Sequence, residues 1–288
     1  MNTLSLPDIL VDVDWLKQHI DHPGLVVLDA SSHMPGVPRD AYAEWQQQRL
    51  PNSRFFDFNH KICDTSSPLP HMLPTPEVFT AEAQALGINH DSGVVIYDSL
   101  GIFSAPRAWW MLTAMGHTQC AVLDGGLPQW LNNHGHTESG DNNSRIESGN
   151  FVAALNPAMV KDKDQVLKAI DQNNIAIIDA RGTARFNGTA QEPREGLISG
   201  HIPNSYNLPF TELLEDSKFK PIDQLKHLFA DKLNHQQALY ASCGSGVTAC
   251  IIAFAAQRCG FKDIAVYDGS WSEWGQPELA LPIETASE

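Results

Sequence analysis

Residues 238–260, "ALYASCGSGVTACIIAFAAQRCG", run from a short apolar segment into a cysteine, a glycine-containing loop and a second apolar segment. The segment "ALYAS" (238–242) is typical of a buried strand, and residues 248–260 have the pattern of a helix that Gly260 ends. A strand that leads through a short loop into a helix is the repeating unit of a parallel sheet covered on both faces. This stretch therefore predicts an α/β fold.

The pattern around this stretch occurs twice in the chain. The segments "LVVLDA" (25–30), "LPNSRFFDF" (50–58) and "GHTQCAVLDGGLPQW" (116–130) are followed, in the same order, by "IAIIDA" (175–180), "IPNSYNLPF" (202–210) and "GFKDIAVYDGSWSEW" (260–274). Three matches in one order indicate a tandem duplication. We predict two tandem α/β domains, residues 1–140 and 166–288, each a mostly parallel sheet with helices on both faces. A polar linker joins them at 141–165.

Within each predicted domain, short apolar runs alternate with helical patterns. The expected strands are 25–29, 93–98 and 120–124 in the first copy and 175–179, 238–242 and 264–268 in the second. The stretch "SAPRAWWMLTAMG" (104–116) predicts a helix that matches 248–260 in form. If Gly116 is aligned with Gly260, Ser99 stands opposite Cys243, so the first copy lacks the cysteine.

Composition and charge exclude several classes of protein. The 288 residues are 42% hydrophobic and carry a formal net charge of −15, which suits two folded domains and disfavours a nucleic-acid or anionic membrane partner. No apolar run approaches the roughly 18 residues that a spanning helix needs, and no secretory signal is visible at the N-terminus. The five scattered cysteines fit free thiols in a reducing cytoplasm. The H-x-H pair at His134 and His136 lacks neighbouring ligands, so no metal is expected.

Cys243 lies where ligands bind in open parallel sheets, beyond the carboxyl end of a strand. The loop Gly244–Thr248 contains two glycines, which allow backbone N–H groups to converge on one point, and the following helix adds positive potential. Such a cup favours the nucleophilic thiolate. The alternative is a structural cysteine buried in a tight turn, which is common for this residue type.

Three other uses of the loop conflict with its residues. A P-loop requires a lysine before Ser or Thr, and residues 243–249 contain none. A cysteine phosphatase requires an arginine where Ala249 stands, and a thiol–disulfide motif requires a second cysteine three residues on, whereas Cys250 is seven residues away. The residues therefore favour a single nucleophilic cysteine.

Arg181, Arg185 and Arg194 cluster in "ARGTARFNGTAQEPREG", directly after the predicted strand 175–179. In an acidic protein, such a cluster after a strand end indicates an anion site, because guanidinium binds carboxylate bidentately. The alternative is a solvated loop in which the arginines pair with Glu192 and Glu195. Since two strands of one domain precede the two loops, we expect the arginines and Cys243 to share one rim.

The sequence resembles the rhodanese superfamily over nearly its whole length, and within it the 3-mercaptopyruvate sulfurtransferases. The resemblance rests on "CGSGVTA", "GLISGHIPNSYNLPF", "YDGSWSEW", "SPLPHMLP" and "FSAPRAWWML". It implies two tandem rhodanese-like domains, of which only the second carries the catalytic cysteine. Thiosulfate-preferring members carry basic residues after the cysteine, whereas mercaptopyruvate users carry Gly-Ser-Gly, as Gly244, Ser245 and Gly246 do.

The resemblance also implies a role for individual residues. Cys243 would take the sulfur of 3-mercaptopyruvate as a persulfide and pass it to cyanide or to a thiol such as reduced thioredoxin, without a cofactor. Arg185 and Arg194 would hold the substrate. The loop residues Gly244, Gly246, Val247 and Thr248 would stabilise the charged sulfur with their backbone amides.

A serine–histidine–acid relay is a further implication of the resemblance, and Ser245 and His71 match its first two members. The segment "FFDFNHKICDTSSPLPHML" is one residue longer than the family pattern, so the acid position falls among Asp57, Asn59 and Asp64. His71 could instead be an interdomain surface residue. Two other functions remain open: a thiosulfate sulfurtransferase, and a non-catalytic rhodanese-like sulfur-relay or binding module.

Overall fold

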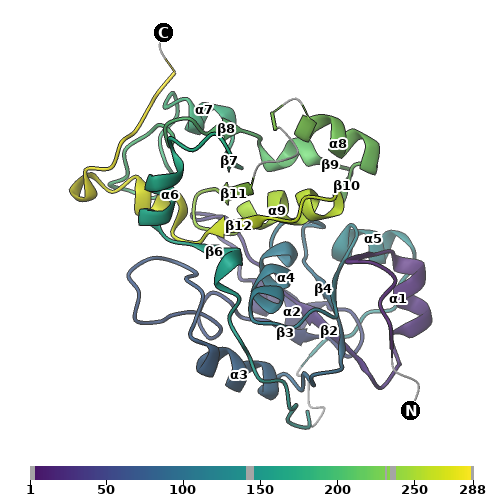
Figure 1. The fold of residues 1–288 in the computed structure, drawn as a ribbon. Helices are drawn as coiled ribbons and strands as arrows, with labels where there is room; N and C mark the ends of the chain where they lie inside the picture. The colour runs from purple at the N-terminus through teal and green to yellow at the C-terminus, as the bar shows by residue number, and fades with distance from the viewer. Residues whose placement is uncertain (1–3, 141–145, 231, 234–237, 287–288) are drawn as a thin grey trace. The chain divides into compact units, whose positions relative to one another are not determined.

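The computed structural model describes residues 4–140, 146–230, 232–233 and 238–286. The chain forms two compact units (Figure 1). The first comprises residues 1–65, 73–155 and 216–219, and the second comprises 66–72, 156–215 and 220–288. Each unit therefore contains one short segment that is distant in sequence from the rest of it. The predicted domain bounds of 1–140 and 166–288 stay a prediction.

The first unit is built on a five-stranded sheet in the order β1-β5-β4-β2-β3, and all its strand pairs are parallel. Helix α4 packs against β4 and β5. The elements are β1 (Leu10–Val11), α1 (Val13–His19), β2 (Leu25–Asp29), α2 (Ala41–Gln47), β3 (Arg54–Phe55), α3 (Pro76–Ala85), β4 (Gly93–Tyr97), α4 (Ala105–Ala114), β5 (Cys120–Leu123) and α5 (Gly126–Asn132).

The second unit repeats this architecture with a parallel sheet in the order β6-β12-β11-β7-β8. Helix α9 packs against β11 and β12 as α4 does against its own strands. The elements are η1 (Pro157–Met159), β6 (Val160–Lys161), α6 (Lys163–Ala169), β7 (Ile175–Asp179), α7 (Thr183–Phe186), β8 (Tyr206–Asn207), η2 (Phe210–Leu213), α8 (Ile222–Ala230), β11 (Ala238–Ser242), α9 (Ala249–Arg258), β12 (Ile264–Tyr267), α10 (Ser270–Trp274) and η3 (Pro277–Leu279). The two-residue strands β9 (Leu214–Glu215) and β10 (Lys218–Phe219) lie outside both five-stranded sheets.

These elements confirm the predicted α/β fold and its tandem repeat. Each of the six predicted strands is present to within one residue, and both predicted helices occur, at 105–114 and 249–258. The segment predicted as a linker, 141–165, includes residues 141–145, which lie outside the described residues. Its later part contains η1, β6 and the start of α6, where Asp162 and Gln165 form a capping box.

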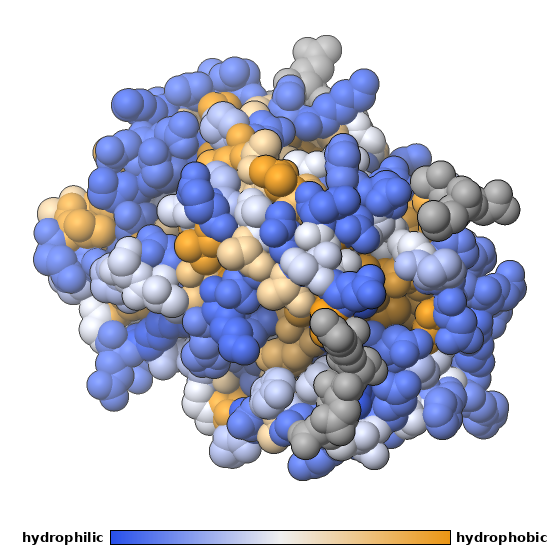
Figure 2. Space-filling view, turned by 90° about the horizontal axis from the view of Figure 1, so that it is seen from below, coloured by the Kyte–Doolittle hydropathy of each residue, from blue (hydrophilic) through white to orange (hydrophobic). Residues whose placement is uncertain are grey.

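The hydrophobic cores account for the near-continuous apolar strands. In β4 every residue is buried, and eight of the ten residues of α9 are buried, as expected when helices cover both faces of a parallel sheet. Trp130 anchors the core of the first unit, and Trp271 and Trp274 anchor that of the second. On the face drawn in Figure 2, hydrophilic residues cover most of the surface and hydrophobic ones form small separate areas. In the described ranges, no helix combines the length and the apolar character that crossing a membrane requires.

Candidate active site

Cys243 is the first residue after β11, and its side chain is 2% exposed. The neighbouring strand β7 ends in register with β11, because Asp179 pairs with Ser242. The loop that begins at Cys243 and the loop that contains the three arginines therefore leave the sheet at the same edge. This confirms the expectation that the two loops share one rim.

The loop after Cys243 is held from outside by the segment after β12. Ser270 Oγ accepts hydrogen bonds from Cys243 N (3.1 Å) and Gly246 N (3.2 Å), and donates to Tyr267 O (2.7 Å). Ser272 donates to Gly244 O from both its backbone N (2.8 Å) and its Oγ (2.7 Å). These contacts fix the loop before any ligand binds.

Sequence reasoning did not find Ser270. The residue lies in the motif "YDGSWSEW" but 27 positions after Cys243, so only the pairing of β11 with β12 brings the two together. Its backbone has φ +49° and its side chain is fully buried. A buried non-glycine residue in the left-handed region is costly. We infer that serine is kept here because its hydroxyl makes the hydrogen bonds that hold the loop.

Besides the N–H group of Gly244, four backbone N–H groups in the loop and at the start of α9 remain available to a ligand. Across the described part of the chain, the N–H groups of Ser245, Val247, Thr248 and Ala249 have no hydrogen-bond acceptor. Gly246 has φ +74°, which favours glycine and lets the loop turn tightly. Buried backbone N–H groups are rarely left unpaired, so this arrangement indicates an anion-binding cup.

The first unit contains a loop equivalent to the one that follows Cys243. Strand register and backbone hydrogen bonds place Asp98, rather than Ser99, opposite Cys243, so the predicted equivalence of Ser99 and Cys243 is wrong. The reason is that the loop between strand and helix spans residues 98–104 in the first unit and 243–248 in the second, one residue fewer. The matching backbone hydrogen bonds are Ala30 N to Tyr97 O and Ala180 N to Ser242 O, and Leu127 N to Asp98 O and Trp271 N to Cys243 O.

The Asp98 carboxylate fills the cup of the first unit. Its Oδ1 accepts from Leu100 N (2.9 Å), and its Oδ2 accepts from the N–H groups of Phe103 (2.8 Å), Ser104 (2.9 Å) and Ala105 (2.9 Å). Counted from the strand end and the helix start, these are the counterparts of the four N–H groups without acceptors in the second unit. The loop geometry therefore suits a negative charge on the side chain of the first loop residue.

Arg185 and Arg194 both approach the cup at Gly244. A Cβ atom at Gly244 would lie 3.1 Å from Arg185 Nη2 and 3.9 Å from Arg194 Nη1. Arg194 Nη2 also donates to Ser245 Oγ at 3.2 Å. Burial lowers the pKa of Arg194, while the nearby Cys243 and Glu192 oppose this shift. The two predicted substrate-binding arginines thus lie beside the predicted nucleophile.

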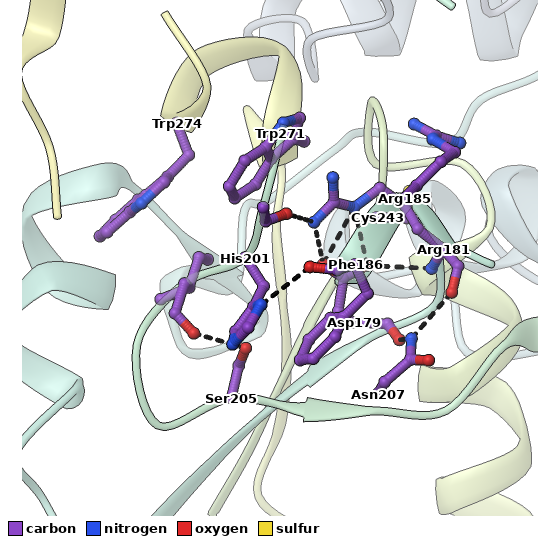
Figure 3. Close-up of polar contacts among 12 residues, drawn as sticks. Asp179, Arg181, Arg185, Phe186, His201, Ser205, Asn207, Cys243, Trp271 and Trp274 are labelled. Carbon is purple, nitrogen blue, oxygen red and sulfur yellow. Dashed lines mark hydrogen bonds and ion pairs between the residues drawn. The ribbon is translucent and has the colours of Figure 1, made fainter. Parts of the chain in front are cut away.

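Arg181 has a structural role instead. Its guanidinium is buried against Asp179, with Nη2 2.6 Å from Oδ2, and lies 4.0 Å from the centre of the Trp271 ring (Figure 3). Its Nη1 donates to Glu192 Oε1 at 2.8 Å. Glu192 also pairs with Arg185, but its side chain is only 2% exposed. The ion pairs that Arg181 and Arg185 make with Glu192 are therefore largely buried, although much of the loop around them is exposed.

The segment that carries His71 belongs to the second unit. His71 has φ +63°, and residues 68–70 line a pocket of about 360 Å³ together with Arg194, Ser272 and Gln276. Ser245 makes its side-chain hydrogen bond to Arg194, so the structure does not join Ser245 and His71 directly. Of the candidate acids, Asp57 accepts from His60 N and contacts His60 Nδ1. The relay stays a prediction.

Comparison with known proteins identifies the family. The family model described as rhodanese-like domain matches residues 12–133 and 162–277, and the chain therefore belongs to the rhodanese family. It is similar to the protein of Escherichia coli (strain K12) named 3-mercaptopyruvate sulfurtransferase, with 41% identity over 95% of this chain and 97% of that protein. It is 43% identical to the thiosulfate sulfurtransferase of Cricetulus griseus, over 92% of this chain and 91% of that protein.

A solved structure gives the same result. The crystal structure of SseA from Escherichia coli, described as showing the rhodanese fold of 3-mercaptopyruvate sulfotransferases, matches with a TM-score of 0.83 and 39% identity. The match covers 92% of this chain and 99% of that one. In the described ranges, no group of three or more His, Cys, Asp or Glu side chains is arranged to hold a metal ion.

Proposed function

We propose that the chain is a 3-mercaptopyruvate sulfurtransferase that carries sulfur as a persulfide on Cys243. The observation that carries the proposal is the set of four N–H groups without acceptors around Cys243. Their counterparts in the first unit bind the carboxylate of Asp98. A cup that accepts a carboxylate at this position also suits a thiolate or a charged persulfide.

In the first half-reaction, the Cys243 thiolate attacks the thiol sulfur of 3-mercaptopyruvate. An S–S bond forms, the C–S bond of the substrate breaks, and its electron pair passes to the methylene carbon as the enolate of pyruvate. The substrate thiol proton moves to that carbon, which gives pyruvate. Ser245 and His71 are the residues that we assign to this proton transfer. The loop N–H groups hold the negative charge that stays on the persulfide.

Arg185 and Arg194 support the choice of donor. Both guanidiniums reach the edge of the cup at Gly244, where they suit the carboxylate and carbonyl of the substrate. A basic residue at 244, as in thiosulfate-preferring members, would place its Cβ 3.1 Å from Arg185 Nη2. Arg185 would therefore have to shift slightly to accept a side chain at position 244.

In the second half-reaction, an acceptor thiolate or cyanide attacks the outer sulfur of the persulfide, and Cys243 leaves as a thiolate. We assign this role to a reduced thiol such as that of thioredoxin. Such an acceptor is kept reduced in the cytoplasm, where we place the reaction.

Intact-protein mass spectrometry tests the proposal. The wild-type protein is incubated with 3-mercaptopyruvate or with thiosulfate, and the fraction that gains one sulfur atom is followed over time. We expect rapid loading from 3-mercaptopyruvate, slow loading from thiosulfate, and none in Cys243→Ser. Cys250→Ser is the matched control, because Cys250 lies inside α9, and it should load like wild type.

Three results contradict the proposal in different ways. Faster loading from thiosulfate than from 3-mercaptopyruvate would make the protein a thiosulfate sulfurtransferase. No loading from either donor would leave a non-catalytic rhodanese-like module. Sulfur found on Cys250 instead of Cys243 would refute the assignment of the nucleophile.

A further inference from the structure

Glu192 stands between two arginines next to the sulfur-transfer site. Its Oε1 accepts hydrogen bonds from Arg181 Nη1 (2.8 Å) and Arg185 Nε (3.1 Å), and its Oε2 accepts from Arg185 Nη2. Arg181 in turn donates from Nε and Nη2 to the carboxylate of Asp179. A continuous chain of ion pairs thus runs from the end of β7 to the edge of the cup.

Apart from the Cys243 thiolate, which the loop N–H groups hold, the side chains of this ion-pair chain and Arg194 leave one net positive charge at the cup. Asp179 balances Arg181, and Glu192 balances Arg185. Arg194 has the neutral hydroxyl of Ser245 as its hydrogen-bond partner in the described ranges. Because the Glu192 side chain is 2% exposed and that of Arg185 19%, water screens these charges only partly.

We propose that Glu192 sets the charge of the sulfur donor that the site prefers. One net positive charge matches a donor with a single carboxylate, such as 3-mercaptopyruvate, and is one charge short for a dianion such as thiosulfate. Glu192 touches neither donor. It acts through Arg185 as a positioning and charge-balancing residue. This inference rests on the proposed function.

The obvious alternative is that Glu192 merely holds Arg185 in place. The two roles differ in what they predict for the ratio of the donors. Loss of position weakens both donors, since both are anions that Arg185 contacts. Loss of the negative charge favours the dianion over the monoanion, because the two donors differ by one unit of charge. For charges roughly 10 Å apart at an effective dielectric constant of about 20, that difference is worth about tenfold.

The test compares kcat/KM for 3-mercaptopyruvate and thiosulfate in four proteins: wild type, Glu192→Gln, Glu192→Asp and Glu212→Gln. The Gln variant keeps the size of the side chain and removes its charge. The Asp variant keeps the charge and shortens the side chain. Glu212→Gln removes the same charge from an exposed position. We expect the ratio of thiosulfate to 3-mercaptopyruvate to rise about tenfold in Glu192→Gln only.

An unchanged ratio in Glu192→Gln overturns the inference, as does an equal shift in Glu192→Asp or Glu212→Gln. Failure of the wild type to use 3-mercaptopyruvate at all refutes the proposed function instead, so the two failures are distinguishable. If Glu192→Gln does not fold, competitive inhibition of the wild type by propionate and by sulfate is measured instead. A site with one net positive charge should bind propionate more tightly than sulfate, and tighter binding of sulfate overturns the inference.

Discussion

Replacing Asp98 with alanine removes the internal anion of the first unit and leaves its cup unfilled. The carboxylate is 1% exposed and has two accepting oxygens. Three of the four donors share Oδ2, so we count one full charge-assisted bond for each oxygen, at about 2 kcal/mol. Asp98→Ala should therefore destabilise the first unit by about 4 kcal/mol. Asp98→Asn keeps one carbonyl oxygen for the shared donors and should cost about half as much.

Hydrogen exchange measures this effect separately in the two units. Peptides that cover α4 report on the loop of Asp98, and peptides that cover α9 serve as the internal reference. In Asp98→Ala, amides of α4 should exchange about a thousandfold faster, which corresponds to about 4 kcal/mol, and those of α9 should be unchanged. Added formate should restore protection in Asp98→Ala, because it supplies the missing carboxylate to the same N–H groups.

Two results would refute the reasoning about the cup. Exchange in α4 that stays within tenfold of wild type would mean that the four N–H groups do not need an anion. A variant that is destabilised as expected but does not respond to formate would mean that Asp98 acts through its covalent position. In either case, the internal carboxylate could no longer serve as evidence for an anion at Cys243.

The remaining predictions concern three other residues. Ser270→Ala and Ser270→Gly both remove the hydroxyl that holds the loop, so sulfur loading should fall about tenfold or more in each. Ser270→Gly should be about 1 kcal/mol more stable to urea than Ser270→Ala, because φ +49° suits glycine; activities equal to that of wild type would refute the anchoring role. Burial raises the pKa of Asp29 from 3.8 to about 6. The folded state therefore favours the protonated acid, and the free energy of unfolding should fall by about 3 kcal/mol as pH rises from about 4 to above 6. Asp29→Asn should abolish this slope in urea titrations, and an unchanged slope would assign it to another group. Arg185→Ala should raise KM for 3-mercaptopyruvate about tenfold with a smaller effect on kcat, and an unchanged KM would remove Arg185 from the site.

The sequence allowed the fold to be predicted because its signals are local. Apolar runs such as 175–179 and 238–242 lie in largely buried parallel strands, where no alternation with polar residues interferes. Cys243 could be singled out for the same reason, since a strand end and a helix start flank it directly in the chain. Arg185 and Arg194 could be placed near it because both loops follow neighbouring strands.

Features that depend on contacts between distant residues were missed or misjudged. Aligning the two helix ends placed Ser99 opposite Cys243, because a one-residue difference in loop length leaves no mark in the helix pattern. The strand register and the backbone hydrogen bonds of the structure reveal that Asp98 takes this position. Likewise, Glu192 could be read as a surface partner of the arginines, because sequence alone does not show that it is buried.

The two copies of the loop differ in how the unpaired backbone N–H groups are satisfied. Both bring four backbone N–H groups to the side chain of the first residue after a central strand, and an anion is needed there to satisfy them. In the first unit Asp98 supplies a permanent charge, so its cup is closed to any ligand. In the second unit, under the proposed function, Cys243 would supply a charge that can be converted from thiolate to persulfide and back. On this proposal, the duplication separates a copy with a built-in anion from one that can react. The same comparison explains why the reactive copy alone carries the arginines at its rim: only an open cup has a substrate to bind.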